Sequence, residues 1–311
     1  MKRILVTGGA GYIGSACVNT LCDKGYEVVV VDNLRTGKRS LVDERADFFA
    51  LDLAHDDLSP LFEQPVDAVI HFAAYKAVEE SMEDAVKYSD NITGSLNLLN
   101  AMVGRGVKKI VFSSTSAVYG NPDYTPIDER HPLRPESYYG QTKLLFESVL
   151  QWYKRVHGVA YVALRYFNVV GDMVGYLDPA PKNVVPLIFE AATGKKDLFT
   201  IFGDDYDTSD GTCIRDYIDI DDLVRAHVIA LDYDGCASLN IGTEHGTSVK
   251  ELFALAEEVV GKKIPMTVSG RRKGDPVKVV ASYRKAKELL GWEPEVPLDH
   301  SLRTTWKVYQ E

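Results

Sequence analysis

A glycine-rich turn directly after an apolar run limits this chain more than any other feature. The segment ILVTGGAGYIGS, residues 4–15, places Gly8, Gly11 and Gly14 three residues apart, and Gly9 with the last two fits G-x-G-x-x-G. Glycines at this spacing permit a tight turn from a strand into a helix and let the backbone approach a pyrophosphate at the helix N-terminus. The segment therefore predicts the start of a dinucleotide-binding β-α-β unit.

The second apolar run, EVVVVDN at residues 27–33, ends in an acid where a ribose would lie. Asp32 follows Gly14 by eighteen residues. A carboxylate at this distance can bind both hydroxyls of an adenosine ribose and would repel a 2′-phosphate. The sequence therefore favours NAD over NADP, and favours both over a glycine turn without a ligand.

Short apolar runs recur along the first half of the chain, and most are separated by segments with helical spacing of apolar residues. Because the runs lack polar alternation, they suit strands that helices cover on both faces, as in a parallel sheet. We expect an α/β fold with a doubly wound parallel sheet that binds ligands at the carboxyl ends of its strands. The expected strands are 4–6, 28–31, 48–51, 68–72, 110–112 and 159–164.

The alternation of strands and helices breaks near residue 170. Residues 171–183 contain two prolines and residues 203–212 are polar and acidic, so both segments are predicted loops. We expect a nucleotide-binding domain over residues 1–170, to which some later segments return. A smaller substrate-binding domain over residues 171–311 would cap the ligand edge. Helices are expected there at 249–260 and 282–290.

The charge balance narrows the partners. The formal net charge is −10 and the sequence pI is about 5.3, which argues against general binding of nucleic acids or anionic membranes. No run approaches the roughly 18 apolar residues of a membrane span, and the apolar run near Met1 is too short for a signal peptide. We therefore expect a soluble, cytoplasmic protein.

Cysteine and histidine show no pattern of metal ligation. The four cysteines lack the paired spacing of zinc sites, and Cys17 and Cys22 suit the core face of one helix. The seven histidines show no ligand spacing either. We expect reduced thiols and no metal.

Hydroxyl side chains cluster where the fifth apolar run ends. The segment IVFSSTSAVYG, residues 110–120, brings Thr115 and four other hydroxyls to one expected strand end. Downstream, YYGQTK places Tyr139 and Lys143 four residues apart, on one face of a helix. A lone Y-x-x-x-K pair is commonly a surface aromatic beside a surface lysine. Here it follows a glycine turn, an acid and a hydroxyl run, and that order favours an active site.

The order of these motifs resembles the extended short-chain dehydrogenase/reductase family. The resemblance runs over nearly the whole chain, from VTGGAGYIG through SSTSAVYG and YYGQTK to RYFNVVG and AKELLGW. Within the family, HFAAYKAVEES, IFGDDYDTSDGTCIRDYIDIDDL and RRKGD are similar to the enzymes that invert carbon 4 of UDP-sugars. The resemblance implies a NAD-dependent isomerase that interconverts UDP-galactose and UDP-glucose through a 4-keto sugar and keeps its cofactor bound.

Three residues would share the chemistry of such an inversion. A free tyrosine has a pKa of about 10, and lowering it by about three units requires roughly 4 kcal/mol. Two cations at about 5 Å could each supply roughly 3 kcal/mol at an effective dielectric of about 20, before desolvation takes some back. Lys143 and an oxidised nicotinamide would be those cations, with Tyr139 as general base. The resemblance assigns Thr115 the hydrogen bond to the reacting oxygen.

The residues after Thr115 distinguish this chain from the related sugar-nucleotide dehydratases. In those enzymes an Asp-Glu pair follows the active hydroxyl and drives the loss of water. Ser116 and Ala117 stand at these positions here, and neither side chain can act as that acid or base. The chain is therefore expected to oxidise and reduce its substrate without dehydrating it.

The resemblance also implies a set of cofactor contacts. Asp52 has a chemical logic of its own, since a carboxylate can accept from the adenine amino group, whereas Phe72 and Ala73 could equally be core residues. The cofactor set is Gly8, Gly11, Tyr12, Ile13, Gly14, Asp32, Asn33, Asp52, Leu53, Phe72, Ala73, Ala74, Lys76, Asn91, Tyr139, Lys143 and Phe167.

Residues from the later part of the chain would hold most of the UDP-sugar. Arg215 and Arg272 suit a diphosphate because a guanidinium can bind two oxygens at once, and Asp275 suits a ribose hydroxyl. The alternative is that Arg215 pairs with Asp216 or Asp219 and that Arg272 is a solvated surface charge. The substrate set is Thr115, Tyr139, Asn168, Asn183, Val184, Phe202, Arg215, Arg272, Asp275 and Val279.

Val279 bears on the choice of sugar. Some family members carry a tyrosine there that closes the sugar pocket, so valine predicts room for a 2-acetamido group and turnover of UDP-GlcNAc and UDP-GalNAc. Three rival interpretations are a 4-epimerase of UDP-glucuronate or a UDP-pentose, a dehydrogenase that exchanges NAD(H), and a non-catalytic NAD-binding scaffold. The intact set of Thr115, Tyr139 and Lys143 disfavours the scaffold.

Two expected helices, near residues 92–104 and 140–156, carry long apolar faces. In the family that the chain resembles, such helices commonly form a four-helix interface. The resemblance therefore implies a homodimer.

Overall fold

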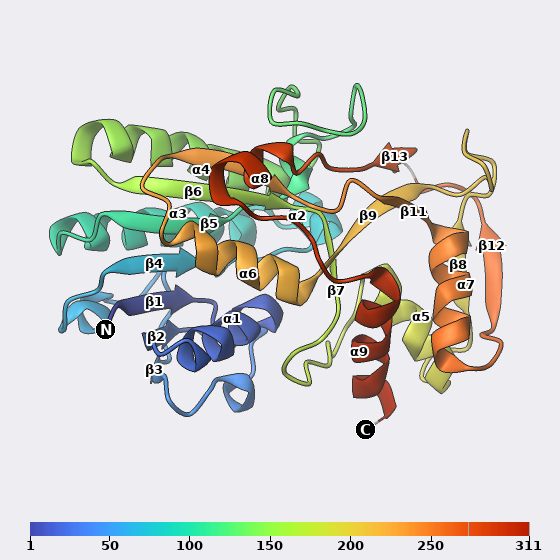
Figure 1. Cartoon of the computed structure of the whole chain (residues 1–311), viewed down its shortest axis with the longest axis horizontal. Coiled ribbons are helices and arrows are strands. Elements are labelled where there is room, and N and C mark those ends of the chain that lie inside the picture. The colour runs from blue at the N-terminus through green and yellow to red at the C-terminus, as the bar shows by residue number, and fades with distance from the viewer. Residues whose placement is uncertain (273, 311) are drawn as a thin grey trace.

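The apolar runs assemble into one parallel sheet (Figure 1). The structure is a computed structural model that describes residues 1–272 and 274–310. Its large sheet contains β1 (Arg3–Thr7), β2 (Glu27–Val31), β3 (Asp47–Phe49), β4 (Ala68–His71), β5 (Lys109–Ser113), β6 (Ala160–Tyr166) and β10 (Ala237–Ile241). Their spatial order in the described chain is β10-β6-β5-β4-β1-β2-β3, and all neighbours run parallel. The predicted doubly wound sheet is confirmed.

Helices cover both faces of this sheet because successive residues of each strand point to opposite sides. On β1, Ile4 and Val6 pack into one core and Leu5 into another, and all three are fully buried. The first core includes α1 (Tyr12–Asp23), α6 (Ile220–Ala230) and α8 (Arg284–Leu290), and the second includes α3 (Ala85–Gly104) and α4 (Tyr138–His157). Across residues 1–272 and 274–310, no helix combines the length and hydropathy that a bilayer crossing requires.

A smaller group of elements lies beyond the carboxyl edge of the sheet, at the right of Figure 1. Its strands are β7 (Asn168–Val170), β8 (Phe199–Phe202), β9 (Ile214–Asp219), β11 (Gly246–Ser248), β12 (Met266–Ser269) and β13 (Lys278–Val279). Three helices, α5 (Val184–Thr193), α7 (Val249–Val260) and α9 (Leu298–Gln310), share a third core with β8. The helix expected at 249–260 is confirmed, because Ser248 and Glu251 form a capping box and Gly261 ends the helix in a left-handed conformation.

Some boundaries differ from the expected ones. β3 ends at Phe49 rather than residue 51, since Asp52 starts a turn in which its N–H donates to Asp56. α8 begins at Arg284 rather than 282, and a short α2 (Val78–Glu83) follows β4. Residues 171–183, all of them described, form the expected loop. The domain division at residue 170 stays a prediction; α6 and β10 lie beyond it in the chain and join the large sheet.

Candidate active site

The glycine turn leaves the space that a pyrophosphate needs. Gly8 has a φ of 70°, and a Cβ there would lie 2.7 Å from the backbone nitrogen of Ala73. A Cβ on Gly14 would lie 2.1 Å from the Gly8 carbonyl oxygen, so α1 can approach the turn only without a side chain. Gly11 is the N-cap of α1 and offers no side-chain cap, which leaves the first-turn N–H groups available to an anion. This cradle fits the diphosphate of a dinucleotide.

Tyr12 and Ile13 begin α1 directly after the turn and pack partly against the core. The Tyr12 hydroxyl donates to the Gly171 carbonyl at 2.5 Å, and its ring lies 5.3 Å from that of Tyr176. These contacts hold the 171–183 loop against the glycine turn. The loop therefore packs against the predicted cofactor site, whereas the sequence marked only its last residue, Asn183, as a site residue.

Asp32 connects the end of β2 to the glycine turn. One carboxylate oxygen accepts from the Ala10 N–H at 3.0 Å and the other from the Leu34 N–H at 2.8 Å. Burial raises the pKa of this carboxyl, while both backbone bonds oppose the shift. A carboxylate oxygen has two lone pairs, so both retain capacity to accept from ribose hydroxyls.

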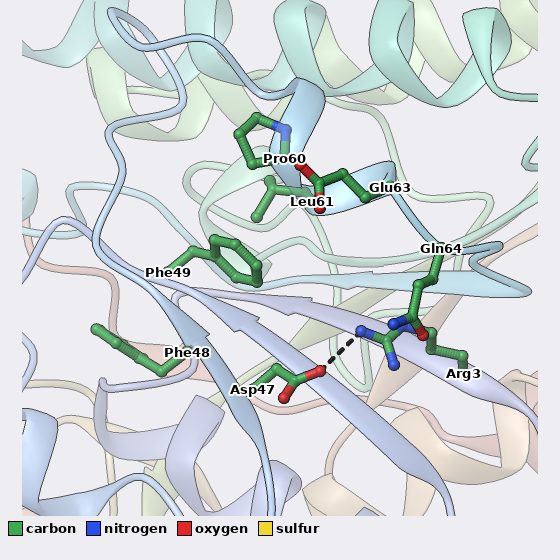
Figure 2. Close-up of a pocket in the computed structure, with 8 residues that line it drawn as sticks. All are labelled: Arg3, Asp47, Phe48, Phe49, Pro60, Leu61, Glu63 and Gln64. Atoms are coloured by element: carbon green, nitrogen blue, oxygen red, sulfur yellow. Dashed lines mark hydrogen bonds and ion pairs between the residues drawn. The ribbon is translucent and has the colours of Figure 1, made fainter.

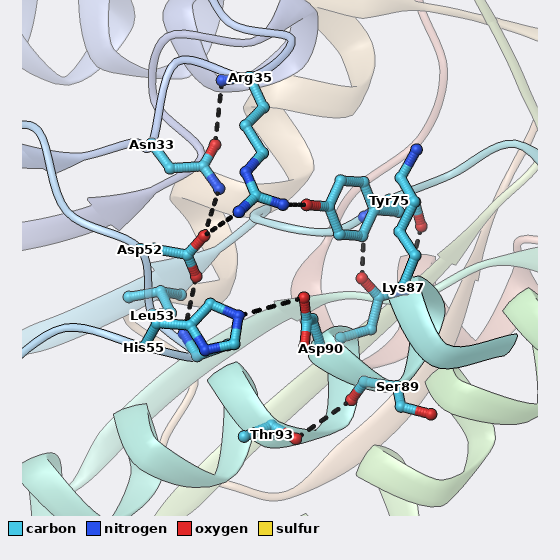
Figure 3. Close-up of polar contacts among 12 residues, drawn as sticks. Asn33, Arg35, Asp52, Leu53, His55, Tyr75, Lys87, Ser89, Asp90 and Thr93 are labelled. Carbon is cyan, nitrogen blue, oxygen red and sulfur yellow. Dashed lines mark hydrogen bonds and ion pairs between the residues drawn. The ribbon is translucent and has the colours of Figure 1, made fainter. Parts of the chain in front are cut away.

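The adenine side of the predicted cofactor site follows β3 (Figure 3). Asp52 accepts from the Asn33 side chain at 2.9 Å and from the Ala54 N–H at 2.9 Å, and Leu53 is buried beside it. Burial acts to raise the pKa of Asp52, but the bonds from Asn33 and Ala54 and the nearby charge of Arg35 lower it below its ordinary value. Asp52 is therefore an anionic acceptor, as an adenine amino group requires.

The loop after β4 is fixed by a buried polar chain that the sequence did not reveal. His71 bonds Thr7 through Nδ1 at 2.6 Å and Ser95 through Nε2 at 2.8 Å. Burial lowers the pKa of His71 to about 3, so its ring is neutral. The Ala73 N–H donates to the Thr7 hydroxyl at 3.3 Å, and this ties the loop to the end of β1. Phe72, Ala73 and Ala74 are half-buried in this loop, and Lys76 is exposed.

Tyr139 and Lys143 lie one turn apart on α4, and both are buried, at 7% and 4% exposure. The Lys143 Nζ donates to the Ser113 carbonyl at 2.9 Å and lies 5.9 Å from the centre of the Tyr139 ring. Gly140 brings this turn against the hydroxyl run, because a Cβ there would lie 2.6 Å from the Ala117 carbonyl oxygen. The predicted pair thus meets the end of β5.

Burial acts against both charges of this pair. It raises the pKa of Tyr139 well above its ordinary value; the nearby Tyr166 phenol adds to the shift and a hydrogen bond with Thr115 opposes it. Burial lowers the pKa of Lys143 to about 7, while the Glu147 carboxylate acts to raise it. Lys143 is therefore close to its titration midpoint at neutral pH.

The hydroxyls of residues 113–119 separate into distinct roles. The Thr115 side chain accepts from the Ala117 N–H at 3.2 Å and caps the short 3₁₀ turn Ser116–Val118, beside Tyr139. The Ser113 hydroxyl bonds that of Tyr166 at 2.8 Å, and Ser114 donates to Glu147 at 2.5 Å. Thr115 is thus the hydroxyl of the run that contacts the tyrosine.

A buried ion pair between α4 and β6 supports the segment after β5 that carries these hydroxyls. Glu147 accepts from Arg165 of β6 through two nitrogens, at 3.0 and 2.5 Å, and also from Ser114 and Ser238. Arg165 donates to the Tyr119 hydroxyl at 3.0 Å. An arginine inside the apolar run YVALRYF is a usable signal of this pair, because a buried charge requires a partner.

Arg215 and Asp275 meet across β9 and the segment before β13. The Arg215 Nη2 donates to Asp275 at 2.9 Å, and Nη1 donates to the Pro276 carbonyl at 2.8 Å. The alternative pairing of Arg215 with Asp216 or Asp219 is wrong, since Asp216 accepts from Thr243 at 2.7 Å instead and Arg215 lies with Asp275. Two predicted substrate residues are thereby joined.

The remaining substrate candidates lie on several elements. The Arg272 guanidinium is exposed, as the alternative of a surface charge requires, and it lies 4.0 Å from the centre of the ring of Phe202, another predicted substrate residue. Asn183 is the N-cap of α5, with Val184 next to it, and its side chain makes no capping bond. Asn168 is exposed and donates to the Asp216 carbonyl at 3.0 Å.

Val279 pairs in register with Arg215 and packs against a buried cluster that contains Phe167. Asn91 binds both backbone groups of Tyr75, at 2.8 and 3.0 Å. Phe167, a predicted cofactor residue, therefore lies in the same cluster as Val279, a predicted substrate residue. The Asn91 side chain is instead engaged with the backbone of the loop after β4.

A separate hollow of about 280 Å³ lies at the opposite edge of the sheet (Figure 2). Arg3 and Asp47, at the amino ends of β1 and β3, form an ion pair of 2.8 Å across it. None of the predicted site residues lines this hollow. The chemistry-bearing residues gather at the carboxyl edge instead.

Comparisons with known proteins match nearly the whole chain to one family of enzymes. The model of the NAD dependent epimerase/dehydratase family matches residues 4–242. A UDP-glucose 4-epimerase of Lacticaseibacillus casei is 44% identical over 319 residues, which cover 99% of this chain and 96% of that protein. The crystal structure of UDP-glucose 4-epimerase from Brucella ovis in complex with NAD is similar, with a TM-score of 0.95, 38% identity and coverage of 99% and 98% of the two chains. The UDP-Glc/GlcNAc 4-epimerase from Campylobacter jejuni is also similar, with a TM-score of 0.88, 36% identity and coverage of 100% and 99%.

Proposed function

Because the chain belongs to the NAD dependent epimerase/dehydratase family, we propose that it is an isomerase that interconverts UDP-galactose and UDP-glucose. Inversion at carbon 4 proceeds through a 4-keto sugar, with NAD as the resident cofactor. The observation that carries the proposal is the buried Tyr139 at the carboxyl end of β5, which hydrogen-bonds Thr115 and has the Lys143 Nζ 5.9 Å from its ring centre. The relatives that are named UDP-glucose 4-epimerase support the choice of sugar.

Tyr139 acts as the general base and acid. Its phenolate accepts the proton of the sugar 4-hydroxyl and returns it when the ketone is reduced, so the reaction has no net proton or redox change. Bound NAD supplies the chemistry for removing and returning the hydride at carbon 4. The Thr115 hydroxyl donates a hydrogen bond to the reacting oxygen and keeps that oxygen oriented toward the phenol.

Lys143 favours ionisation of the Tyr139 phenol. Its Nζ is held by the Ser113 carbonyl, 5.9 Å from the centre of the tyrosine ring. A protonated amine at such a distance favours the ionised phenol over the neutral one. Burial opposes both charges, so the protonated lysine must supply part of the compensation.

Arg215, Asp275 and Arg272 hold the nucleotide part of the substrate. The two guanidinium groups bind the diphosphate, and Asp275 binds a ribose hydroxyl. Inversion requires the 4-keto sugar to present its other face while the nucleotide remains bound. Anchoring by the diphosphate permits that rotation.

We also propose that the sugar pocket accepts a 2-acetamido group, because Val279 stands where a larger side chain would close it. The similar enzyme from Campylobacter jejuni is named for both UDP-Glc and UDP-GlcNAc, which supports this extension. Val279→Tyr should abolish turnover of UDP-GlcNAc and retain that of UDP-glucose. Equal loss with both sugars would contradict the assignment of Val279.

A homodimer is part of the same proposal. Trp152 and Val156 of α4 are 62% and 67% exposed. Leu145, about two turns before Trp152 and three before Val156 on the same helix, is also exposed. Val86, at the start of the neighbouring α3, is also exposed. Large apolar side chains gathered on paired helices are typical of an interface.

The proposal places the protein in the cytoplasm. Cys17, Cys22, Cys213 and Cys236 are free thiols. Such thiols suit a compartment that keeps cysteine reduced.

Product analysis tests the proposed function. The purified protein is incubated with UDP-galactose, UDP-glucose, their N-acetyl forms, UDP-glucuronate and a UDP-pentose, without added NAD. We expect UDP-galactose and UDP-glucose to give the same final mixture. A requirement for fresh NAD in each turnover would instead indicate a dehydrogenase, and conversion of the uronate or pentose alone would replace the hexose assignment.

A further inference from the structure

Side chains that the proposed mechanism does not use tie together the loops after β2, β3 and β4 (Figure 3). Arg35, from the first loop, donates through Nη1 to the Tyr75 hydroxyl of the third loop at 2.5 Å. Its Nη2 also lies 3.5 Å from the Asp52 carboxylate of the second loop. One guanidinium therefore bridges all three loops.

Tyr75 is a fixed anchor for this bridge. The Asn91 side chain binds its backbone on both sides, accepting from the N–H at 2.8 Å and donating to the carbonyl at 3.0 Å. The Lys87 Nζ lies 4.8 Å from the centre of the Tyr75 ring, and the Tyr88 ring lies 5.8 Å away. The phenol thus has a defined position toward Arg35.

The backbone turn that carries Arg35 is held by Asp32, the predicted ribose acid, and by Asn33. Leu34 has a φ of 58°, in the left-handed region that a bulky residue rarely adopts. The Leu34 N–H donates to Asp32 at 2.8 Å, and the Arg35 N–H donates to the Asn33 side chain at 3.1 Å. This strained turn directs the arginine away from Asp32 and toward the other loops.

Exposure gives the order of these groups from the interior outward. Asp32 is 9% exposed, the Asp52 side chain 17% and the Arg35 side chain 52%. The two acids that suit ribose and adenine thus lie inside, and the guanidinium lies outside them. A ligand seated on those acids would have the Arg35–Tyr75 bridge at its solvent side.

We propose that Arg35 and Tyr75 form a strap across the adenosine end of bound NAD, and that opening of this strap limits the release of the cofactor. The inference rests on the proposed function, in which NAD stays bound through the cycle. An exposed ion pair and a single hydrogen bond are weak enough to break and re-form, so the strap slows exchange without preventing loading.

Release of radiolabelled NAD tests the strap. The wild-type protein, Arg35→Ala and Tyr75→Phe are loaded with the label and separated from free nucleotide, and its loss is followed in excess unlabelled NAD. We expect both variants to release the label about threefold to tenfold faster than the wild type. The double variant should be no faster than the faster single variant, because both changes break the same contact.

Arg45→Ala is the matched control. Arg45 is 55% exposed and pairs with Asp23 and Asp43, near the amino end of β3 and away from the three loops. Its variant should release NAD at the wild-type rate. Wild-type release from both strap variants, or equal acceleration in Arg45→Ala, would overturn the strap alone. A wild-type protein that binds no label would overturn the proposed function together with it.

Discussion

At the scale of single residues, the site depends on charges that burial opposes. The pKa of Tyr139 is raised and that of Lys143 is lowered to about 7, in each case mainly by desolvation. The hydrogen bond with Thr115 acts to lower the pKa of Tyr139, and the Glu147 charge acts to raise the pKa of Lys143, so both oppose the effect of burial. The protonation of the pair is therefore set by its immediate neighbours and by what binds there.

Tyr139→Phe should lower kcat for UDP-galactose by about 10²- to 10⁴-fold, which is the usual contribution of a general base. NAD should remain bound, because the change removes only the phenolic oxygen. Tyr138→Phe is the control. Tyr138 precedes Tyr139 on the same helix, and its hydroxyl bonds that of Ser89 on α3 at 2.8 Å. A steady-state assay checks both variants, and a near-normal rate in Tyr139→Phe would refute its role as base.

Lys143 should make stability depend on pH. The unfolded chain keeps this proton up to its ordinary pKa of 10.5, whereas the folded chain loses it near pH 7. The unfolded state thus binds more protons in that window, and the free energy of unfolding contributed by Lys143 rises with pH. After removal of nucleotide, the wild type should gain about 2 kcal/mol relative to Lys143→Met between pH 7 and pH 9.

Urea unfolding at several pH values measures this gain. Lys154→Met, an exposed lysine on the same helix, should keep the pH dependence of the wild type. A constant difference between the wild type and Lys143→Met, or one that moves the other way with pH, would contradict the assignment.

At the scale of elements, α4 joins the catalytic pair to the sheet. Lys143 and Glu147 are one turn apart, so the face that carries the chemistry also carries the buried ion pair to β6. Ser114 donates to the same carboxylate and lies beside both Ser113 and Thr115. The ion pair therefore positions the backbone that binds Lys143.

Glu147→Gln should lower the free energy of unfolding by about 3 kcal/mol, because Arg165 would lose its buried partner. It should also lower the pKa of Lys143 further, since the Glu147 charge acts to raise it. Urea unfolding and the pH titration described for Lys143 measure the two effects. Glu258→Gln, on the exposed face of α7, should change neither, and unaltered stability of Glu147→Gln would contradict the role of the ion pair.

Local sequence rules accounted for part of these elements. The spacing of glycines predicted the turn into α1, and Ser248 with Glu251 and Gly261 fixed both ends of α7. The buried chain of Thr7, His71 and Ser95 could not be predicted, because its members are distant in sequence and meet only after β1, β4 and α3 have packed.

At the scale of the molecule, the exposed apolar side chains of α3 and α4 belong to the helical layer that covers one face of the sheet. The double variant Trp152→Glu, Val156→Glu should convert the proposed dimer into a monomer, since charge opposes burial at an interface. Light scattering after gel filtration measures the mass. Met266→Glu, which alters an exposed apolar side chain of β12, should remain dimeric. A monomeric wild type at micromolar concentration would contradict the proposal.

The gathering of site residues at one edge followed from the parallel sheet, because all its strands end there. Thus Asp32, Thr115 and the loop after β4 could be placed together from sequence. The pairing of Arg215 with Asp275 could not, since it depends on how β13 aligns with β9. The strap of Arg35 and Tyr75 also required the arrangement of three loops.

In the proposed reaction one hydride leaves carbon 4 and returns to it within a single site. UDP-galactose with deuterium at carbon 4 is converted in ordinary water, and the UDP-glucose formed is examined by mass spectrometry and NMR. We predict that the deuterium stays on carbon 4, because Tyr139 moves only the hydroxyl proton. Loss of the deuterium to solvent would contradict transfer of a hydride to and from bound NAD.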